Sequence, residues 1–393
     1  MCAAGIYTVA KKIINVPVRP LLQSTTVCIM SRMRTGSKKI SAVDLFCGVG
    51  GLTHGLVSAG VTVAAGYDID ATCKYPYEAN NGGATFHEVD VTKLSPDTVA
   101  AHFPEDAYKV LVGCAPCQPY SSITNKVRKG KDAKALEENW GPLRAFLRLI
   151  REIRPDVVSM ENVTRLANRA KNPIYGEFVD GLGAAGYEVS EANIYCPEYG
   201  VPQRRRRLVL MASRHGPIAL PPPTHTKETF GTVEKALAGL PAVAAGEAHP
   251  DDPLHVSRNL TALNLARVKA SKPGGTWEDW PSELRLACHS RDTGKTFKSV
   301  YGRMLSSEPS PTITTEFYNL GTGRFVHPTE DRGLSLREGA LLQTFPRDYR
   351  FVEDGKRVSM TALGRHIGNA VPVGLGEAIG RAIVEHLACR ATS

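Results

Sequence analysis

The sequence lacks the features that mark several classes of protein. No run of about 18 apolar residues occurs, so we expect no transmembrane helix. The only Cys-x-x-Cys pair, Cys114 and Cys117, has no second pair and no His-x-x-x-His motif beside it, so we expect neither a structural zinc nor another metal site. The nine cysteines are odd in number and scattered, which favours reduced thiols in a cytosol or nucleus over a disulfide framework.

The N-terminal part of the chain lacks acidic residues. Residues 1–43 contain no Asp or Glu but several Lys and Arg, a composition that resembles a transit peptide. We favour two other interpretations, a disordered basic arm or a translation start at Met30 or Met33. We therefore expect residues 1–39 to lie outside the folded domains.

The whole chain carries an excess of basic residues. Its formal net charge is +9 and its isoelectric point is about 9.0. This excess indicates an anionic partner, with nucleic acid as the first candidate, although a basic surface without such a partner has the same total charge. The hydrophobic content of 42% and the charged content of 22% are typical of a globular protein.

Strands and helices alternate over the first half of the chain. Residues 41–46 are an apolar run that leads into a glycine-rich turn, and a helical stretch and a second strand ending at Asp68 follow. The apolar residues of 141–154 recur at helical spacing. This order predicts an α/β fold with a doubly wound, Rossmann-like sheet. Further strands are expected at 109–116, 156–162, 187–195 and 206–212.

The alternation ends near residue 214. Residues 214–330 are rich in Pro and Gly and hold Trp277 and Trp280, which predicts a second, smaller domain that is irregular and β-rich. Residues 331–393 include two more helical stretches, which we expect to pack back on the first domain. The predicted division is an arm at 1–39, an α/β domain at 40–213, the inserted domain at 214–330 and a completing segment at 331–393.

The glycine-rich turn FCGVGG resembles a dinucleotide-binding turn but is incomplete. A Gly-x-Gly-x-x-Gly motif counted from Gly48 through Gly50 would need a third glycine at position 53, which is Thr53. Asp68, which closes the second strand 20 residues after Gly48, is well placed to hold ribose hydroxyls. A glycine turn with a ribose-binding acid, but without the pyrophosphate motif, suits S-adenosylmethionine better than NAD.

Five short motifs follow one another along the chain. They are FCGVGG, APCQ, MENV at 160–163, QRRRR at 203–207 and GNAV at 368–371. Together they resemble the motif series of the DNA cytosine-5 methyltransferases, from about residue 41 to the C terminus, and the inserted segment matches least. Each motif alone is weakly specific, whereas five in order are highly specific. APC replaces the more common Pro-Pro-Cys of that family.

The resemblance implies the catalytic residues. The nucleophile would be Cys117, whose thiolate adds to C6 of cytosine. Glu161 would hold N3 and the amino group of the base and assist that attack by protonating N3. Arg207 would contact O2 of the base or steady Glu161, and Arg205 would contact the neighbouring phosphate. We interpret Cys114 as a small buried filler and expect no redox pair with Cys117.

The resemblance also implies a cofactor site and a DNA interface. The segment 122–139 after the nucleophile is interpreted as a mobile lid over both, and residues 214–330 as the target-recognition domain. The residues expected to bind S-adenosylmethionine are Phe46, Gly48, Val49, Gly50, Gly51, Asp68, Ile69, Asp90, Val91, Pro116, Leu143, Asn369 and Val371. Those expected to bind DNA are Ser121, Gln203, Arg204, Arg303, Thr312 and Thr314.

The sequence therefore predicts methyl transfer from S-adenosylmethionine to C5 of a flipped-out cytosine in a specific double-stranded DNA sequence, through a covalent bond between Cys117 and C6. One alternative is an RNA cytosine-5 methyltransferase, which the large insert and the absence of a Cys-Phe-Thr signature disfavour. Another is a catalytically silent DNA-binding homologue, which would not need Cys117, Glu161 and the cofactor turn together. We expect a compact, monomeric bacterial or phage enzyme of a restriction–modification system, in the cytoplasm and bound to DNA rather than to a membrane.

Overall fold

The computed structural model describes residues 38–116, 140–291 and 295–389. Residues Lys39–Ser393 form one compact unit. The expected arm at 1–39, except its last two residues, and the expected lid at 122–139 lie outside the described residues. No helix in the described part of the chain is long and apolar enough to cross a membrane.

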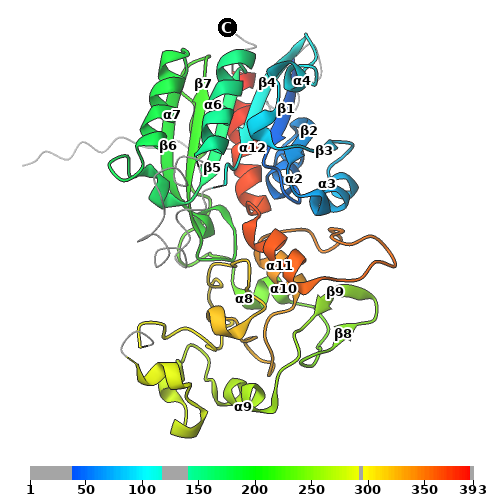
Figure 1. Ribbon diagram of the computed structural model, residues 1–393, viewed down its shortest axis with the longest axis vertical. Helices are drawn as coiled ribbons and strands as arrows, with labels where there is room; N and C mark the ends of the chain where they lie inside the picture. The colour runs from blue at the N-terminus through cyan, green and yellow to red at the C-terminus, as the bar shows by residue number, and fades with distance from the viewer. Residues whose placement is uncertain (1–37, 117–139, 292–294, 390–393) are drawn as a thin grey trace, which may run out of the picture. The chain divides into compact units, whose positions relative to one another are not determined.

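A seven-stranded sheet forms the centre of the α/β part (Figure 1). Its strand order is β3-β2-β1-β4-β5-β7-β6. The first five strands of the chain run parallel, and β7 runs antiparallel to both β5 and β6. The predicted α/β fold is confirmed. The strands are β1 (Lys39–Leu45), β2 (Thr62–Asp68), β3 (Thr85–Glu88), β4 (Ala107–Gly113), β5 (Val157–Asn162), β6 (Glu188–Tyr195) and β7 (Arg206–Ser213).

Helices cover both faces of this sheet, because successive residues of a strand point to opposite faces. In β4, Val110 and Val112 belong to one apolar core and Leu111 to the other. The first core contains α2 (Gly51–Ser58) and α12 (Val373–Ala388), and the second contains α6 (Gly141–Ile153) and α7 (Pro173–Ala184). Two shorter helices, α3 (Lys74–Asn80) and α4 (Pro96–Ala100), lie in the connections.

The C-terminal helix returns to the first helix of the fold. A Cβ atom on Gly55 of α2 would lie 2.4 Å from the Glu377 nitrogen of α12, so only glycine permits this approach. The same segment contains α10 (Leu336–Leu342) and α11 (Met360–Asn369). Helix α12 therefore packs closely on α2, and the division of the chain into domains stays a prediction.

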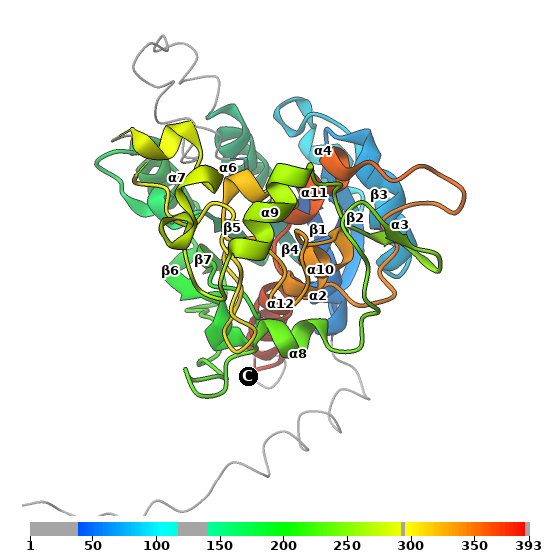
Figure 2. The same cartoon turned by 90° about the horizontal axis from the view of Figure 1, so that it is seen from below.

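The segment 214–330 is irregular, as expected. Its described residues contain one short antiparallel ladder, two short α-helices and several 3-10 helices joined by irregular backbone, so its strand content is lower than we expected. Figure 2 shows this segment from below, and α8 lies beside α10 in both views. The elements are α8 (Val233–Leu237), β8 (Ala248–His249), β9 (Asp252–Val256) and α9 (Ala262–Ala270).

Buried charged side chains stabilise this segment where strand ladders are few. Arg303, only 6% exposed, donates to the carbonyl oxygens of Ser271, Val268, His327 and Glu330. Such bonds satisfy backbone groups that a sheet would otherwise pair. The irregular backbone is thus organised around guanidinium groups.

Candidate active site

Three neighbouring strands bring Cys114, Glu161 and Arg207 together. The parallel strands β4 and β5 pair Gly113 with Met160, so the next residue on each, Cys114 and Glu161, lies at the carboxyl edge of the sheet. The antiparallel strand β7 begins at that edge and supplies Arg207. The Cys114 thiol donates to Glu161 Oε2 at 2.9 Å, and Arg207 Nε lies 2.8 Å from Glu161 Oε1.

Glu161 is buried with one oxygen incompletely satisfied. Its side chain is 3% exposed. Arg207 is close enough to Oε1 for an ion pair, but no donor is aligned for a hydrogen bond to that oxygen among the described residues. A buried polar atom in this state usually has a functional partner that is absent from the structure. The arrangement leaves Oε1 ready for a donor from a bound molecule.

Arg205 lies behind this group and is almost fully buried. Its guanidinium donates to Ile313 O at 3.0 Å and to Gly368 O at 3.3 Å. Burial, together with the charge of Arg207, lowers the pKa of Arg205 to about 9. Arg205 thus joins the GNAV segment to residue 313, which favours a positioning role over the phosphate contact that we expected.

The nucleophile predicted from the sequence, Cys117, lies outside the described residues, as does Ser121. The chain leading to Cys117 is described up to Pro116, which is exposed. Asn162 of β5 donates to Ala115 O at 2.9 Å, so β5 holds this approach in place. Sequence reasoning missed Asn162, although its position in the MENV motif next to Glu161 was an available signal.

The glycine turn and Asp68 meet at the carboxyl ends of β1 and β2. Asp68 Oδ2 accepts a hydrogen bond from Gly48 N at 2.9 Å, and its Oδ1 accepts one from Asp70 N, also at 2.9 Å. Phe46, Gly48 and Gly50 all have positive φ angles. A Cβ atom on Gly48 would have no atom within 4 Å, so the space beside this turn is open. Ligands of doubly wound sheets bind at this edge.

Residues from distant parts of the chain complete this region. A Cβ atom on Gly51 would lie 2.3 Å from Val371 O, which places the GNAV segment against the turn. Ile69 follows Asp68 and is 69% exposed, which is unusual for a large apolar side chain. Asn369 is also exposed.

The other expected cofactor residues are engaged within the protein. Asp90 accepts hydrogen bonds from Thr92 N and Oγ1, and these bonds hold the pKa of Asp90 below its usual value. A contact between Asp90 and the cofactor would therefore compete with these two hydrogen bonds from Thr92. The side chains buried in the apolar cores are those of Val49, Val91, Leu143 and Val371.

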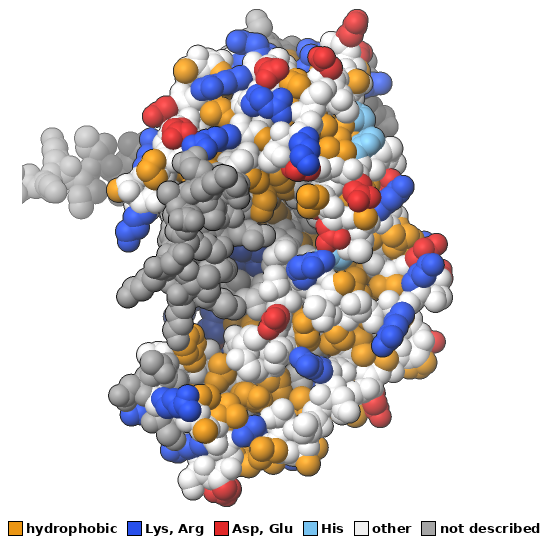
Figure 3. Space-filling model, viewed as in Figure 1, with side chains coloured by type: hydrophobic (Ala, Val, Ile, Leu, Met, Phe, Trp, Pro, Cys, Tyr) orange, Lys and Arg blue, Asp and Glu red, His pale blue; other side chains and the backbone are white. Residues whose placement is uncertain are grey.

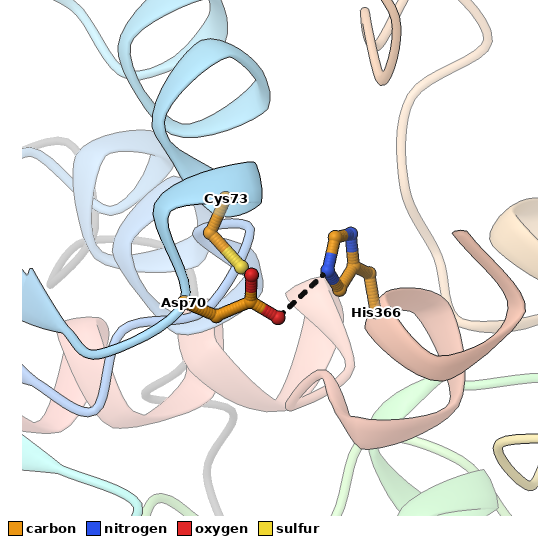
Figure 4. A group of neighbouring side chains, drawn as sticks. All are labelled: Asp70, Cys73 and His366. Carbon is orange, nitrogen blue, oxygen red and sulfur yellow. Dashed lines mark hydrogen bonds and ion pairs between the residues drawn. The ribbon is translucent and has the colours of Figure 1, made fainter. Parts of the chain in front are cut away.

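A cluster of Asp70, Cys73 and His366 lies beside this region (Figure 4). His366 Nε2 lies 3.3 Å from Asp70 Oδ2, and Arg365 donates to the same oxygen at 2.7 Å. The other oxygen, Oδ1, accepts from Thr72. The residues fit a metal ion poorly. Arg365 already donates to the Asp70 carboxylate, and burial raises the pKa of the Cys73 thiol, which must lose its proton to bind a metal. The cluster instead ties α11 to the turn after β2.

Two residues expected to bind DNA are enclosed by the protein. Gln203 is fully buried, donates to Gln343 Oε1 at 2.8 Å and accepts from Ile313 N at 2.8 Å. Arg303 donates hydrogen bonds to backbone carbonyl oxygens and to Asp331 Oδ1, the latter at 2.7 Å. These contacts favour a structural role for both side chains and not the DNA contact that we expected.

The remaining expected DNA residues lie at or near the surface. Arg204 is exposed and pairs with Glu308 at 3.0 Å. Thr312 Oγ1 donates to Arg204 O at 2.9 Å, and Thr314 is exposed. The structure thus brings Arg204 and Thr312 together, and their role in DNA binding stays a prediction.

Comparisons with known proteins agree with this geometry. The model of the family of C-5 cytosine-specific DNA methylases matches residues 40–385. The Type II methylase M.HgiDII of Herpetosiphon aurantiacus is 45% identical over 347 residues, covering 88% of this chain and 96% of that protein. The Type II methyltransferase M1.HphI of Haemophilus parahaemolyticus is 29% identical over 350 residues, covering 88% of this chain and 87% of that protein.

Solved structures share the fold. A protein encoded within an E. coli prophage has a TM-score of 0.65 at 21% identity, covering 89% of this chain and 99% of the other. The S. pombe Dnmt2 methyltransferase has a TM-score of 0.59 at 16% identity, covering 89% and 98%. At these identities the likeness shows the fold alone. The family match over nearly the whole unit, together with the close relative, shows that the chain belongs to the C-5 cytosine-specific DNA methylases and is a DNA cytosine-5 methyltransferase.

Proposed function

We propose that this enzyme methylates C5 of a cytosine that is flipped out of a specific sequence in double-stranded DNA, with S-adenosylmethionine as methyl donor and Cys117 as nucleophile. The observation that carries the proposal is Glu161, a buried carboxylate at the edge of the sheet whose Oε1 has no aligned donor among the described residues. The N3 and amino edge of a flipped cytosine would supply the missing partner.

The proposed chemistry assigns a role to each group around the base. The Cys117 thiolate would add to C6, and the displaced electron pair would reach C5 and make it nucleophilic. Glu161 would share a proton with N3, which offsets the negative charge on the ring. Arg207, 2.8 Å from Glu161, would hold that carboxylate in place. After C5 is methylated, loss of its proton would expel the thiolate and restore the ring.

The residues at the ends of β1 and β2 fit S-adenosylmethionine. When bound, this cofactor would supply a methyl group on a positively charged sulfur. Asp68, partly exposed at the end of β2, would accept bonds from ribose hydroxyls. Ile69, with 69% of its surface exposed, would lie against the adenine. The open space beside Gly48 would admit the cofactor close to the backbone.

We further propose that the enzyme acts in a restriction–modification system, since both bacterial relatives are named as Type II enzymes. Residues 214–330 would then read the DNA sequence. Exposed basic side chains in this segment, such as Arg285 and Lys298, would position it on phosphates. Figure 3 shows Lys and Arg intermixed with acidic residues over the α/β part of the face in view. Phosphate contacts carry no sequence information, so base contacts made by residues 214–330 would decide the site.

The test is base-resolution mapping of 5-methylcytosine in DNA and RNA from bacteria that lack other cytosine-5 methyltransferases. Cells would express the wild type, Cys117→Ser or Glu161→Gln. Methylation of one short DNA sequence by the wild type alone is expected. Methylated RNA with unmodified DNA would favour the RNA alternative. Unmodified nucleic acid, with a soluble protein that still binds DNA, would favour a silent homologue.

A further inference from the structure

We propose that Cys114 is a positioning residue whose thiol fixes the Glu161 carboxylate for recognition of cytosine, and not a small filler of the core. The inference rests on the proposed role of Glu161 and adds a residue to it. It starts from one contact, the hydrogen bond from Cys114 Sγ to Glu161 Oε2 at 2.9 Å.

The strand register makes this contact a fixed feature of the fold. Cys114 and Glu161 each come one residue after the paired residues Gly113 and Met160. Neighbouring parallel strands lie about 4.8 Å apart, so two adjacent side chains at the carboxyl edge meet directly. Asn162 holds the next turn of the same segment through Ala115 O at 2.9 Å. The thiol therefore has little freedom to move away from the carboxylate.

The thiol and Arg207 divide the two oxygens of Glu161 between them. Cys114 donates to Oε2, whereas Arg207 lies 2.8 Å from Oε1 without aligning a hydrogen bond to it. A carboxylate with one oxygen bonded cannot rotate freely, so Oε1 keeps one direction. The oxygen that lacks an aligned donor is then the oxygen that meets the base.

A neutral donor is required for this role. Burial and the charge of Glu161 both raise the pKa of Cys114 well above its usual value, so the thiol keeps its proton at neutral pH. A second cation would cancel the negative charge that the base needs, whereas a thiol orients the carboxylate and leaves its charge in place. Serine could donate in the same way, and alanine could not.

The consequence is selectivity between cytosine and uracil. Cytosine presents an amino donor beside N3, whereas uracil presents the O4 acceptor beside an N3 donor. A carboxylate held in one direction accepts a hydrogen bond from the amino group of cytosine and repels O4 of uracil. A carboxylate that can rotate avoids that repulsion. Loss of the thiol is therefore expected to reduce the preference for cytosine over uracil.

The experiment compares the full-length wild type, Cys114→Ala and Cys114→Ser on duplexes that carry cytosine or uracil at the methylated position. For Cys114→Ala we expect kcat on cytosine to fall about tenfold, equivalent to about 1.4 kcal/mol, with KM values for DNA and cofactor within about twofold. The ratio of cytosine to uracil rates should fall as well. Cys114→Ser should recover most of both losses. Comparing ratios between variants cancels any difference in how easily the two duplexes open.

Two kinetic outcomes would overturn the inference. One is an unchanged cytosine-to-uracil ratio in Cys114→Ala. The other is an equal loss in the alanine and serine variants, which would mean that the sulfur acts by packing alone. If the wild type itself does not methylate DNA, or if Glu161→Gln keeps full activity, the proposed function falls first and this inference with it.

A second measurement does not depend on activity. The infrared S–H stretching band of Cys114, identified as the band that Cys114→Ser removes, should move to higher frequency in Glu161→Gln, because an amide accepts more weakly than a carboxylate. A band that stays in place would show that the thiol does not donate to Glu161, whatever the kinetics give.

Discussion

In the sheet, successive strand residues alternate between two apolar cores, as Val110 and Leu111 of β4 do, whereas the irregular region from residue 214 to the end of α10 is crossed by buried arginines. Arg303 and Arg332 are 6% and 1% exposed, and both bond mostly to backbone carbonyls and carboxylates. Glu161 lies at the edge of the sheet and not within its apolar cores, whereas buried ion pairs hold the irregular region together. Substitution of Glu161 should therefore act on catalysis, and substitution of Glu338 should act on folding.

The largest expected effect is that of Glu161→Gln at the edge of the sheet. The amide cannot share a proton with N3, so kcat should fall about 10²- to 10⁴-fold, while the circular dichroism spectrum stays that of the wild type. The matched control is Glu188→Gln on β6, an exposed residue that should leave kcat unchanged. Single-turnover methylation of a cognate duplex is the measurement. A loss of folded structure equal to the loss of activity would contradict the contrast between the two regions.

Glu338→Gln probes the other region. Glu338 is 1% exposed, accepts two hydrogen bonds from Arg332 at 2.9 and 2.7 Å, and also caps α10. Removing one partner of a buried ion pair should lower the free energy of unfolding by about 3–5 kcal/mol. Urea denaturation followed by fluorescence of the tryptophans measures this loss. Glu283→Gln, an exposed change in the same irregular region, is the control and should have little effect.

Features that depend on neighbouring residues could be predicted from the sequence, and contacts between distant residues could not. The strands, the glycine turn and Asp68 were predictable because each depends on neighbouring residues. The partners of Cys114, Gln203 and Arg303 were not, because they lie 47, 140 and 24 residues away along the chain and depend on register and on the path of irregular backbone. A charged or polar residue in a motif looks the same in sequence whether it faces a ligand or a carbonyl.

The two regions should respond to pH in opposite directions. Burial raises the pKa of Asp44 in β1 to about 7, so Asp44 favours folding below about pH 4 and loses that contribution as the pH rises through 7. Burial would also raise the pKa of Glu338, but the hydrogen bonds and charge of Arg332 hold it below its usual value. Glu338 therefore favours folding above about pH 4 and loses that contribution in more acidic solution.

Asp44→Asn tests this contrast. In the wild type, Thr53 Oγ1 donates to Asp44 Oδ2 at 2.7 Å. The asparagine amide removes the negative charge and keeps an oxygen that can accept this bond. The variant should be more stable than the wild type by about 4 kcal/mol at pH 8 and equal to it at pH 4. Urea denaturation at both pH values measures the difference. Asp97→Asn, an exposed change on α4, should show no such pH dependence, and a gain at pH 4 equal to that at pH 8 would refute the raised pKa.

The smallest expected effect concerns two exposed apolar residues, one chosen from each region. Ile69 beside Asp68 is 69% exposed and Leu263 of α9 is 49% exposed. If Ile69 covers the adenine of the cofactor, Ile69→Ser removes part of that apolar contact and should weaken S-adenosylmethionine binding about tenfold, or about 1.4 kcal/mol. Because the side chain is already exposed, the stability of the protein without cofactor should not fall. Leu263→Ser should leave cofactor affinity unchanged. Isothermal titration of both variants gives the answer without methyl transfer, and equal affinity of Ile69→Ser and wild type would place the adenine elsewhere along the edge of the sheet.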